Sequence, residues 1–176
     1  MKEKEVSNMA EKDYVIPPWT KIKQTSTFNL DELYKMMYYW FDRHEYVFKE
    51  KEYAEQRVQG SKILEIRWYA ERKITDYIKF VIEIGIFCLG IKDVEIEKDG
   101  GKVKTQAGAV EMRFSAYLLK DYEGSWEGNP IAKFFREVYD KYIIGSKIEG
   151  YEDDLYDEAY LLMNEVKAFL NMHKFS

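Results

Sequence analysis

Cysteine and histidine are scarce in this sequence, with one Cys (Cys88) and two His (His44 and His173) among 176 residues. A disulfide needs two thiols, and structural zinc sites take most of their ligands from Cys and His. Catalysis by Cys88 would also need a nearby base. Cys88 lies in the apolar run of residues 84–89, where burial keeps a thiol protonated. We therefore expect no disulfide, no zinc site and no thiol catalysis.

Long apolar runs are also missing. The run of residues 84–89, extended by Gly90 and Ile91, is far shorter than the roughly 20 residues that a membrane-spanning helix needs. The first residues alternate Lys and Glu, and no apolar core of a secretory signal follows them. These absences predict a cytoplasmic protein without a membrane span.

Positive charge is not in excess, because 27 Lys and Arg stand against 32 Asp and Glu, which gives a net charge of −5. Binding of nucleic acid through phosphates needs clustered cations, so the charge balance disfavours a nucleic-acid partner. The spacings of phosphate-binding loops, dinucleotide-binding loops and metalloprotease helices do not occur. We therefore expect no cofactor and no enzymatic activity.

Residues 1–27 lack hydrophobic periodicity and contain the pair Pro17 and Pro18, followed by Trp19. We interpret them as a flexible N-terminal arm. Its apolar side chains favour docking on the protein's own domain over docking on a partner, because large apolar groups rarely stay solvated. Residues 28–176 are expected to form a single α+β domain.

Three helix-start signals coincide at the beginning of this domain. Asn29 is a capping residue with Glu32 three positions later, and Phe28 and Leu33 have the spacing of a hydrophobic staple. The apolar residues that follow have helical spacing as far as about His44. His44 is expected to cap the helix C-terminus rather than to act in catalysis.

From residue 46 the hydrophobic period changes to two, which is typical of half-buried strands. Residues 61–73, 78–86 and 110–118 alternate strictly, whereas residues 46–58 read as a polar edge strand. Weaker candidates flank a turn signal at residues 99–101, and Gly85 and Gly90 suggest a bend or bulge. One-sided alternation is typical of antiparallel sheets, because parallel sheets are covered on both faces.

Helical signals return with Asn129 and Pro130, and Gly145 is a stop signal. After a loop at residues 145–150, a long final helix is expected from about Glu152 to Met172. The sequence thus predicts an α+β fold. A curved antiparallel meander of four or five strands is covered on one face by an N-terminal helix and two C-terminal helices.

Aromatic residues are the clear excess, with 15 Tyr, 10 Phe and 4 Trp. Tyrosine and tryptophan are enriched at protein interfaces because they offer large rigid contact area with a polar tip. We therefore expect first a non-enzymatic interaction or scaffold protein whose partner is another protein or a second copy. The candidate partner-binding residues are Tyr14, Trp19, Tyr69, Tyr77 and Tyr117.

Two other functions stay open. A curved sheet under a long helix can enclose a cavity for a small apolar ligand, with Trp68, Phe80, Met112, Phe114 and Phe169 as its lining. Aromatic and cationic side chains mixed on an open sheet are also typical of single-strand nucleic-acid binding. The acids on that face make ordinary ion pairs the simpler interpretation of its charges.

A cluster of acids marks the start of the expected final helix. Acids in a first turn complement the helix dipole, which is the simpler interpretation, and a cation or a basic partner is the functional one. The cluster comprises Glu152, Asp153, Asp154, Asp157 and Glu158.

Overall fold

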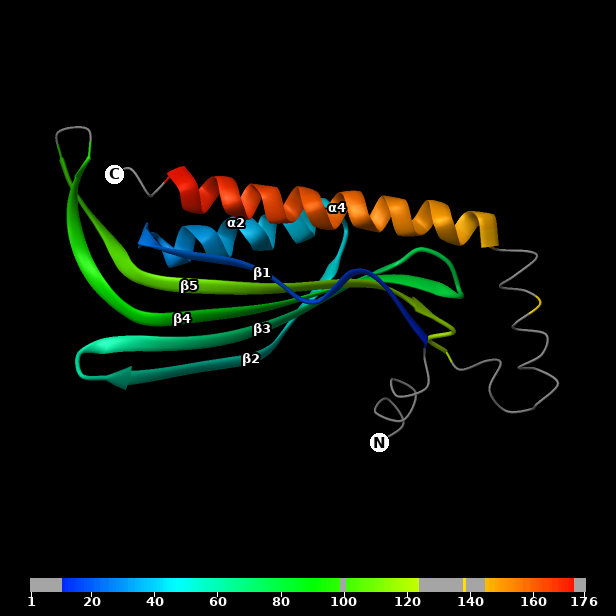
Figure 1. The fold of residues 1–176 in the computed structure, drawn as a ribbon, viewed down its shortest axis with the longest axis horizontal. Coiled ribbons are helices and arrows are strands. Elements are labelled where there is room, and N and C mark those ends of the chain that lie inside the picture. The colour runs from blue at the N-terminus through cyan, green and yellow to red at the C-terminus, as the bar shows by residue number, and fades with distance from the viewer. Residues whose placement is uncertain (1–10, 99–100, 124–137, 139–144, 173–176) are drawn as a thin grey trace.

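The computed structural model describes residues 11–98, 101–123, 138 and 145–172, which form an antiparallel five-stranded sheet with two helices on one of its faces (Figure 1). The α+β prediction is confirmed. The elements are β1 (Glu11–Phe28), α2 (Leu30–Arg43), β2 (Val47–Val58), β3 (Ser61–Lys73), β4 (Ile78–Lys98), β5 (Gly101–Lys120) and α4 (Gly145–Met172).

The strands lie in the order β1-β5-β4-β3-β2. β2 to β5 form the expected meander, since each pairs with the strand that follows it in the chain. β1 departs from a pure meander because it pairs with β5, and α2 then connects β1 at one edge to β2 at the other. One end of β4 and β5 bends toward the helices (Figure 1).

The flexible-arm interpretation is wrong for residues 11–27, which belong to β1. β1 pairs with β5 from Glu11 opposite Lys120 to Phe28 opposite Gln106, and it buries Ile16, Ile22 and Phe28. Docking on the protein's own domain thus takes the form of an added edge strand. Its two prolines and mixed polarity hide the alternation, and an edge strand tolerates proline because its outer N–H groups need no partner strand.

The first helix follows its sequence signals. The side chain of Asn29 accepts a hydrogen bond of 3.2 Å from the backbone N–H of Glu32. His44 is the C-cap residue, as expected, and its Nδ1 lies 2.8 Å from the carbonyl oxygen of Trp40. Its ring stacks on the indole of Trp40, so His44 is held at the end of α2.

The final helix is longer than predicted, because α4 begins at Gly145 and continues through the expected loop at residues 145–150. Its 28 residues span about 42 Å at the usual helical rise. The helix expected from Asn129 lies outside the described residues, apart from Val138. Within the described part of the chain, no helix is both long and apolar enough to cross a membrane.

The alternating residues of the strands form the core beneath α2 and α4, together with buried residues of both helices. Burial extends to Cys88 and raises the pKa of its thiol from 9.0 to about 12. The buried alternating residues are Leu64, Ile66, Trp68, Ala70, Ile78, Phe80, Ile82, Ile84, Ile86, Val110, Met112, Phe114, Ala116 and Leu118. The helices therefore pack on this face, and the opposite face is left for other contacts.

Candidate functional site

The face of the sheet opposite to the helices, called the open face below, presents the alternate residues of β3, β4 and β5. The strand register aligns these residues in rows across the sheet. One row contains Tyr69, Glu83 and Ser115, and the next contains Arg67, Gly85 and Arg113. Tyr117 lies beside the first row on β5, two residues beyond Ser115.

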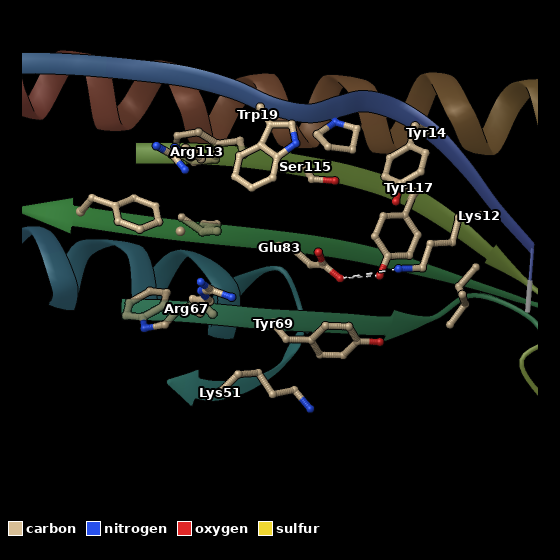
Figure 2. A pocket seen from close by; sticks show the side chains of 17 residues that line it. Lys12, Tyr14, Trp19, Lys51, Arg67, Tyr69, Glu83, Arg113, Ser115 and Tyr117 are labelled. Atoms are coloured by element: carbon tan, nitrogen blue, oxygen red, sulfur yellow. Dashed lines mark hydrogen bonds and ion pairs between the residues drawn. The ribbon is translucent and has the colours of Figure 1, made fainter. Parts of the chain in front are cut away.

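A concavity of about 590 Å³ lies over these rows, and residues from all five strands line it (Figure 2). We call it the open-face hollow. β1 supplies Lys12, Tyr14, Pro18 and Trp19, and β2 supplies Lys51. The volume is within the range of about 300–1,000 Å³ that is typical of ligand pockets.

A bulge in β1 forms one wall of the open-face hollow. The pairing with β5 passes from Ile16 opposite Ala116 to Thr20 opposite Phe114, so residues 17–19 stand opposite Ser115 alone. The hydroxyl of Thr20 donates a 2.9 Å hydrogen bond to the carbonyl oxygen of Pro17 across this β1 bulge.

Trp19 ends the β1 bulge in an unusual backbone conformation. Its φ is 74°, which is rare for a bulky residue, and its side chain is 69% exposed. Figure 2 shows the indole of Trp19 on the open face beside Arg113. Since such strain persists only where the surroundings impose it, the β1 bulge positions this indole.

Cations of the chain lie over the aromatic rings of the open-face hollow. The Nζ atoms of Lys12 and Lys51 lie 4.3 Å and 5.0 Å from the ring centroids of Tyr117 and Tyr69. The guanidinium of Arg113 lies 5.1 Å from the ring centroid of Trp19 on β1 and 4.4 Å from the ring centroid of Phe87 on β4. Cation–π contacts of this kind hold the positive charges in place over the rings.

Glycine leaves room for this ring packing in the floor of the hollow. A Cβ atom at Gly85 would lie 2.9 Å from Cε2 of Phe87, so the Phe87 ring would have to shift to make room for it. Gly85 therefore lets the Phe87 ring lie on the strand and support Arg113. The sequence predicts a bend or bulge at Gly85, whereas in the structure Gly85 allows the ring of Phe87 to pack closely over the strand.

Positive charge prevails among the residues that line the hollow. Four cations (Lys12, Lys51, Arg67 and Arg113) against one acid (Glu83) give 4 − 1 = +3, although the whole chain carries −5. Glu83 accepts a 2.7 Å hydrogen bond from the hydroxyl of Tyr117 and lies 3.9 Å from Lys12.

Carboxylates outside the hollow bind its two arginines. Arg113 donates from Nε and Nη2 to Glu111 over 2.7 Å, and Arg67 donates over 2.8 Å to Glu65. The Arg67–Glu65 pair is exposed, and exposed ion pairs contribute only about 0–1 kcal/mol, whereas the Arg113–Glu111 pair is half-buried. An anionic ligand can therefore compete with Glu65 for Arg67, and Arg113 keeps N–H groups that Glu111 does not use.

The tyrosines of the hollow are held in their neutral form. Burial, followed by the hydrogen bond to Glu83, raises the pKa of Tyr117, and burial followed by the charge of Glu71 raises the pKa of Tyr69. Burial and then the charge of Glu83 raise the pKa of Tyr14 in the same way. At neutral pH these phenols are therefore hydrogen-bonding groups and not nucleophiles or bases.

Ser115 lies in the floor of the hollow, on β5 between Arg113 and Tyr117. Ser115 is only 8% exposed, and its hydroxyl is buried without a hydrogen-bond partner among the described residues. Buried hydroxyls usually have a partner, so this one needs an explanation. The strict alternation of residues 110–118 puts Ser115 opposite the apolar positions, but nothing in the sequence indicates that its hydroxyl lacks a partner among the described residues.

Four of the five candidate partner-binding residues meet in the open-face hollow: Tyr14, Trp19, Tyr69 and Tyr117. The fifth, Tyr77, does not lie on the open face. It precedes β4, is 9% exposed and packs in the hydrophobic core. Sequence alternation cannot place Tyr77 because it lies in a turn between two strands. Nothing in the sequence indicates that three further residues belong to the hollow. Lys12 lies in the expected arm, Lys51 in the expected polar edge strand, and Phe87 in the apolar run of residues 84–89.

The candidate cavity residues belong to the hydrophobic core beneath the helices, and two of them, Trp68 and Phe114, also line the open-face hollow. Trp68, Phe80, Met112 and Phe114 are buried in the core, and Phe169 packs against it from α4. The indole of Trp68 lies edge-on to the rings of Tyr34 and Phe48, at 4.6 Å and 4.5 Å between ring centroids.

The acidic cluster of α4 has a different setting from the expected one, because the helix starts at Gly145 and these acids lie beyond its first turn. Glu158 makes a 2.7 Å ion pair with Arg72 and accepts a 2.8 Å hydrogen bond from the hydroxyl of Tyr46. Within the described residues, no three acids, His or Cys are grouped so that they could hold a metal ion. Asp153, Asp154 and Asp157 are exposed, and burial raises the pKa of Glu152.

Neither a scan against models of known protein families nor a search of curated proteins finds a match for this sequence. The fold and the hollow together define an α+β protein with a one-sided helical layer and an aromatic, cationic open face. The chemistry of the open-face hollow is therefore the guide to its function.

Proposed function

We propose that this protein is a non-enzymatic interaction domain that binds an acidic, extended segment of a partner protein in the open-face hollow. The observation that carries the proposal is the meeting of Tyr14, Trp19, Tyr69 and Tyr117 with two arginines in one concavity. Tryptophan, tyrosine and arginine are the residues in which the binding energy of protein interfaces is concentrated.

Charge supports an acidic partner segment. The lining of the hollow carries +3 in a chain of −5, so this concavity differs in sign from the protein as a whole. Complementary charge steers association and disfavours partners of the wrong sign. The carboxylates that surround the hollow disfavour a polyanion such as nucleic acid, whereas single acidic side chains can reach the cations between them.

The state of the reactive groups supports a non-enzymatic role. The Cys88 thiol is buried with a pKa of about 12, and the tyrosines of the hollow remain protonated at neutral pH. These groups are suited to packing and hydrogen bonding. The chemistry of the hollow is therefore that of recognition.

Binding of designed peptides tests the proposal. In an extended peptide of eight residues, alternating Glu and Tyr present acids on one side and rings on the other. We expect a fluorescein-labelled Glu-Tyr peptide to bind the full chain at least tenfold more tightly than its Gln-Tyr counterpart in fluorescence anisotropy. A Lys-Tyr peptide should bind more weakly still.

A matched pair of variants locates the binding. Arg67→Gln removes a cation of the hollow, whereas Lys35→Gln removes an exposed cation of α2 on the other side of the sheet. Only Arg67→Gln should weaken binding of the Glu-Tyr peptide. Equal or absent binding of the three peptides would show the proposal to be wrong. Salt-sensitive binding of octauridylate in preference to the peptides would instead assign the hollow to single-stranded RNA.

A further inference from the structure

The geometry points to a carboxylate subsite beneath the β1 bulge, an inference that rests on the proposed function. We propose that one acidic side chain of the partner segment binds there. Its carboxylate accepts hydrogen bonds from the hydroxyl of Ser115 and from the guanidinium of Arg113, and Trp19 closes over it.

The hydroxyl of Ser115 is the first observation that carries this inference. Ser115 is 8% exposed, lines the hollow, and has no hydrogen-bond partner among the described residues. A hydroxyl that is buried without a partner costs free energy, which is recovered when an acceptor reaches it. In Figure 2, Ser115 lies on β5 between the side chains of Trp19 and Tyr14, at the β1 bulge.

The β1 bulge is the second observation, because it is the part of β1 that the sheet holds least. Residues 17–19 have no register partners on β5, and two of them are prolines, which have no N–H to donate. Trp19 is strained at φ 74° and largely exposed. A small movement of the bulge therefore opens the way to Ser115 while the pairing on both sides stays in place.

Arg113 supplies the positive charge of the subsite. Its guanidinium is held between the rings of Phe87 and Trp19, and two of its five N–H groups bond to Glu111. The remaining N–H groups can bind an anion. Arg113 and Ser115 are two residues apart on the same face of β5, about 7 Å along the strand, so one carboxylate can reach both side chains.

The surrounding acids select the charge of the ligand. Glu83 lies opposite Ser115 in the sheet, and Glu111 is bonded to Arg113. Both would repel a dianion such as a phosphate monoester more strongly than a monoanion. The subsite therefore fits a carboxylate, and Tyr117 and Lys12 already bind Glu83 so that its charge is partly neutralised.

The experiment compares Ser115→Ala with Ser26→Ala, a β1 variant outside the hollow. Because the Ser115 hydroxyl has no partner, Ser115→Ala should keep the wild-type melting temperature or raise it. We expect Ser115→Ala to reduce affinity for the Glu-Tyr peptide about tenfold and to leave the Gln-Tyr peptide unaffected. Ser26→Ala should bind both peptides like the wild type.

A second probe separates this inference from the proposed function. N-acetylglutamate methylamide, added at millimolar concentration, should shift the indole NMR signal of Trp19 in the wild type but not in Ser115→Ala. If Ser115→Ala binds the Glu-Tyr peptide like the wild type, the subsite is wrong and the proposed function stands. If no peptide binds, but the capped amino acid shifts the Trp19 indole signal in the wild type and not in Ser115→Ala, the proposed function is wrong and the subsite stands. If no peptide binds and the capped amino acid shifts no signal, both the proposed function and the subsite are wrong.

Discussion

Trp19 shows how a single residue links the sequence to the candidate site. Pro17 and Pro18 restrict the chain ahead of it, and the resulting bulge turns its backbone to φ 74°. An L-residue in this conformation is destabilised by roughly 1–2 kcal/mol because Cβ crowds the carbonyl oxygen. The protein tolerates this strain where the indole contacts Arg113, which is consistent with a role in recognition.

Two substitutions at Trp19 separate backbone strain from ring contacts. Trp19→Ala and Trp19→Gly both remove the indole, but only glycine adopts positive φ freely. We expect Trp19→Gly to be about 1 kcal/mol more stable than Trp19→Ala in urea unfolding. The order reverses if the bulge relaxes to negative φ when the indole is absent, because glycine then costs backbone entropy without relieving strain.

Cys88 makes stability depend on alkaline pH. Its pKa is 9.0 for an ordinary thiol and about 12 in the folded protein, so between these values the folded state binds more protons than the unfolded state. Stability must then fall as pH rises, by up to about 1.4 kcal/mol per pH unit. The stabilising contribution of the protonated Cys88 thiol to the free energy of unfolding is fully present below pH 9 and is lost as the pH approaches 12.

Unfolding by urea at pH 8, 9 and 10 measures this contribution. The free energy of unfolding should fall more steeply above pH 9 in the wild type than in Cys88→Ala, whatever the offset between the two proteins. The tyrosines with raised pKa act in both proteins and cancel in the comparison. Parallel curves would mean that the thiol ionises as readily in the folded state as in the unfolded chain.

Among the elements, the strands with strict alternation were predictable and the others were not. Residues 61–73 and 110–118 show apolar side chains at every second position, and the polarity of residues 46–58 predicts the edge strand. β1 was missed because prolines interrupt its alternation. The prediction started α4 too late because Gly145 was taken as a stop signal and residues 145–150 as a loop, whereas packing of the helix on the sheet outweighs the roughly 1 kcal/mol cost of each glycine.

The bulge between β4 and β5 depends on two glycines in different ways. Gly90 has φ 66° with no atom near its missing Cβ, whereas a Cβ at Gly108 would lie 2.6 Å from Cδ1 of Ile91 and 3.1 Å from its Cα. Gly90→Ala should therefore cost about 1 kcal/mol from backbone strain alone. Gly108→Ala also requires the Ile91 side chain to shift and the Ile91 backbone to move by a few tenths of an ångström, so we expect a cost of about 2 kcal/mol. Thermal unfolding should show a larger loss of stability in Gly108→Ala than in Gly90→Ala. An equal loss in the two variants, or a larger one in Gly90→Ala, would contradict this prediction.

The whole molecule combines one packed face with one open face, and this division was predictable because the alternation is one-sided. The gathering of side chains in the open-face hollow was only partly predictable. The sequence indicates Tyr69 and Tyr117 as candidate partner-binding residues, but their meeting with Tyr14 and Trp19 depends on the pairing of β1 with β5. That pairing joins residues about 100 positions apart, and neither hydrophobic period nor turn signals specify it.

Removal of residues 1–27 tests whether this pairing is part of the fold. The deletion removes the buried side chains of Ile16 and Ile22, each worth about 2 kcal/mol, and exposes the unpaired edge of β5. Since domains are stable by only about 5–15 kcal/mol, we expect the shortened chain to lose cooperative unfolding or to aggregate. The double variant Tyr14→Ala/Trp19→Ala is the control, because it keeps the buried residues of β1 and should unfold cooperatively. A shortened chain that unfolds like the full chain in circular dichroism would mean that β1 contributes little to the fold, and the candidate site would then lack a fixed wall.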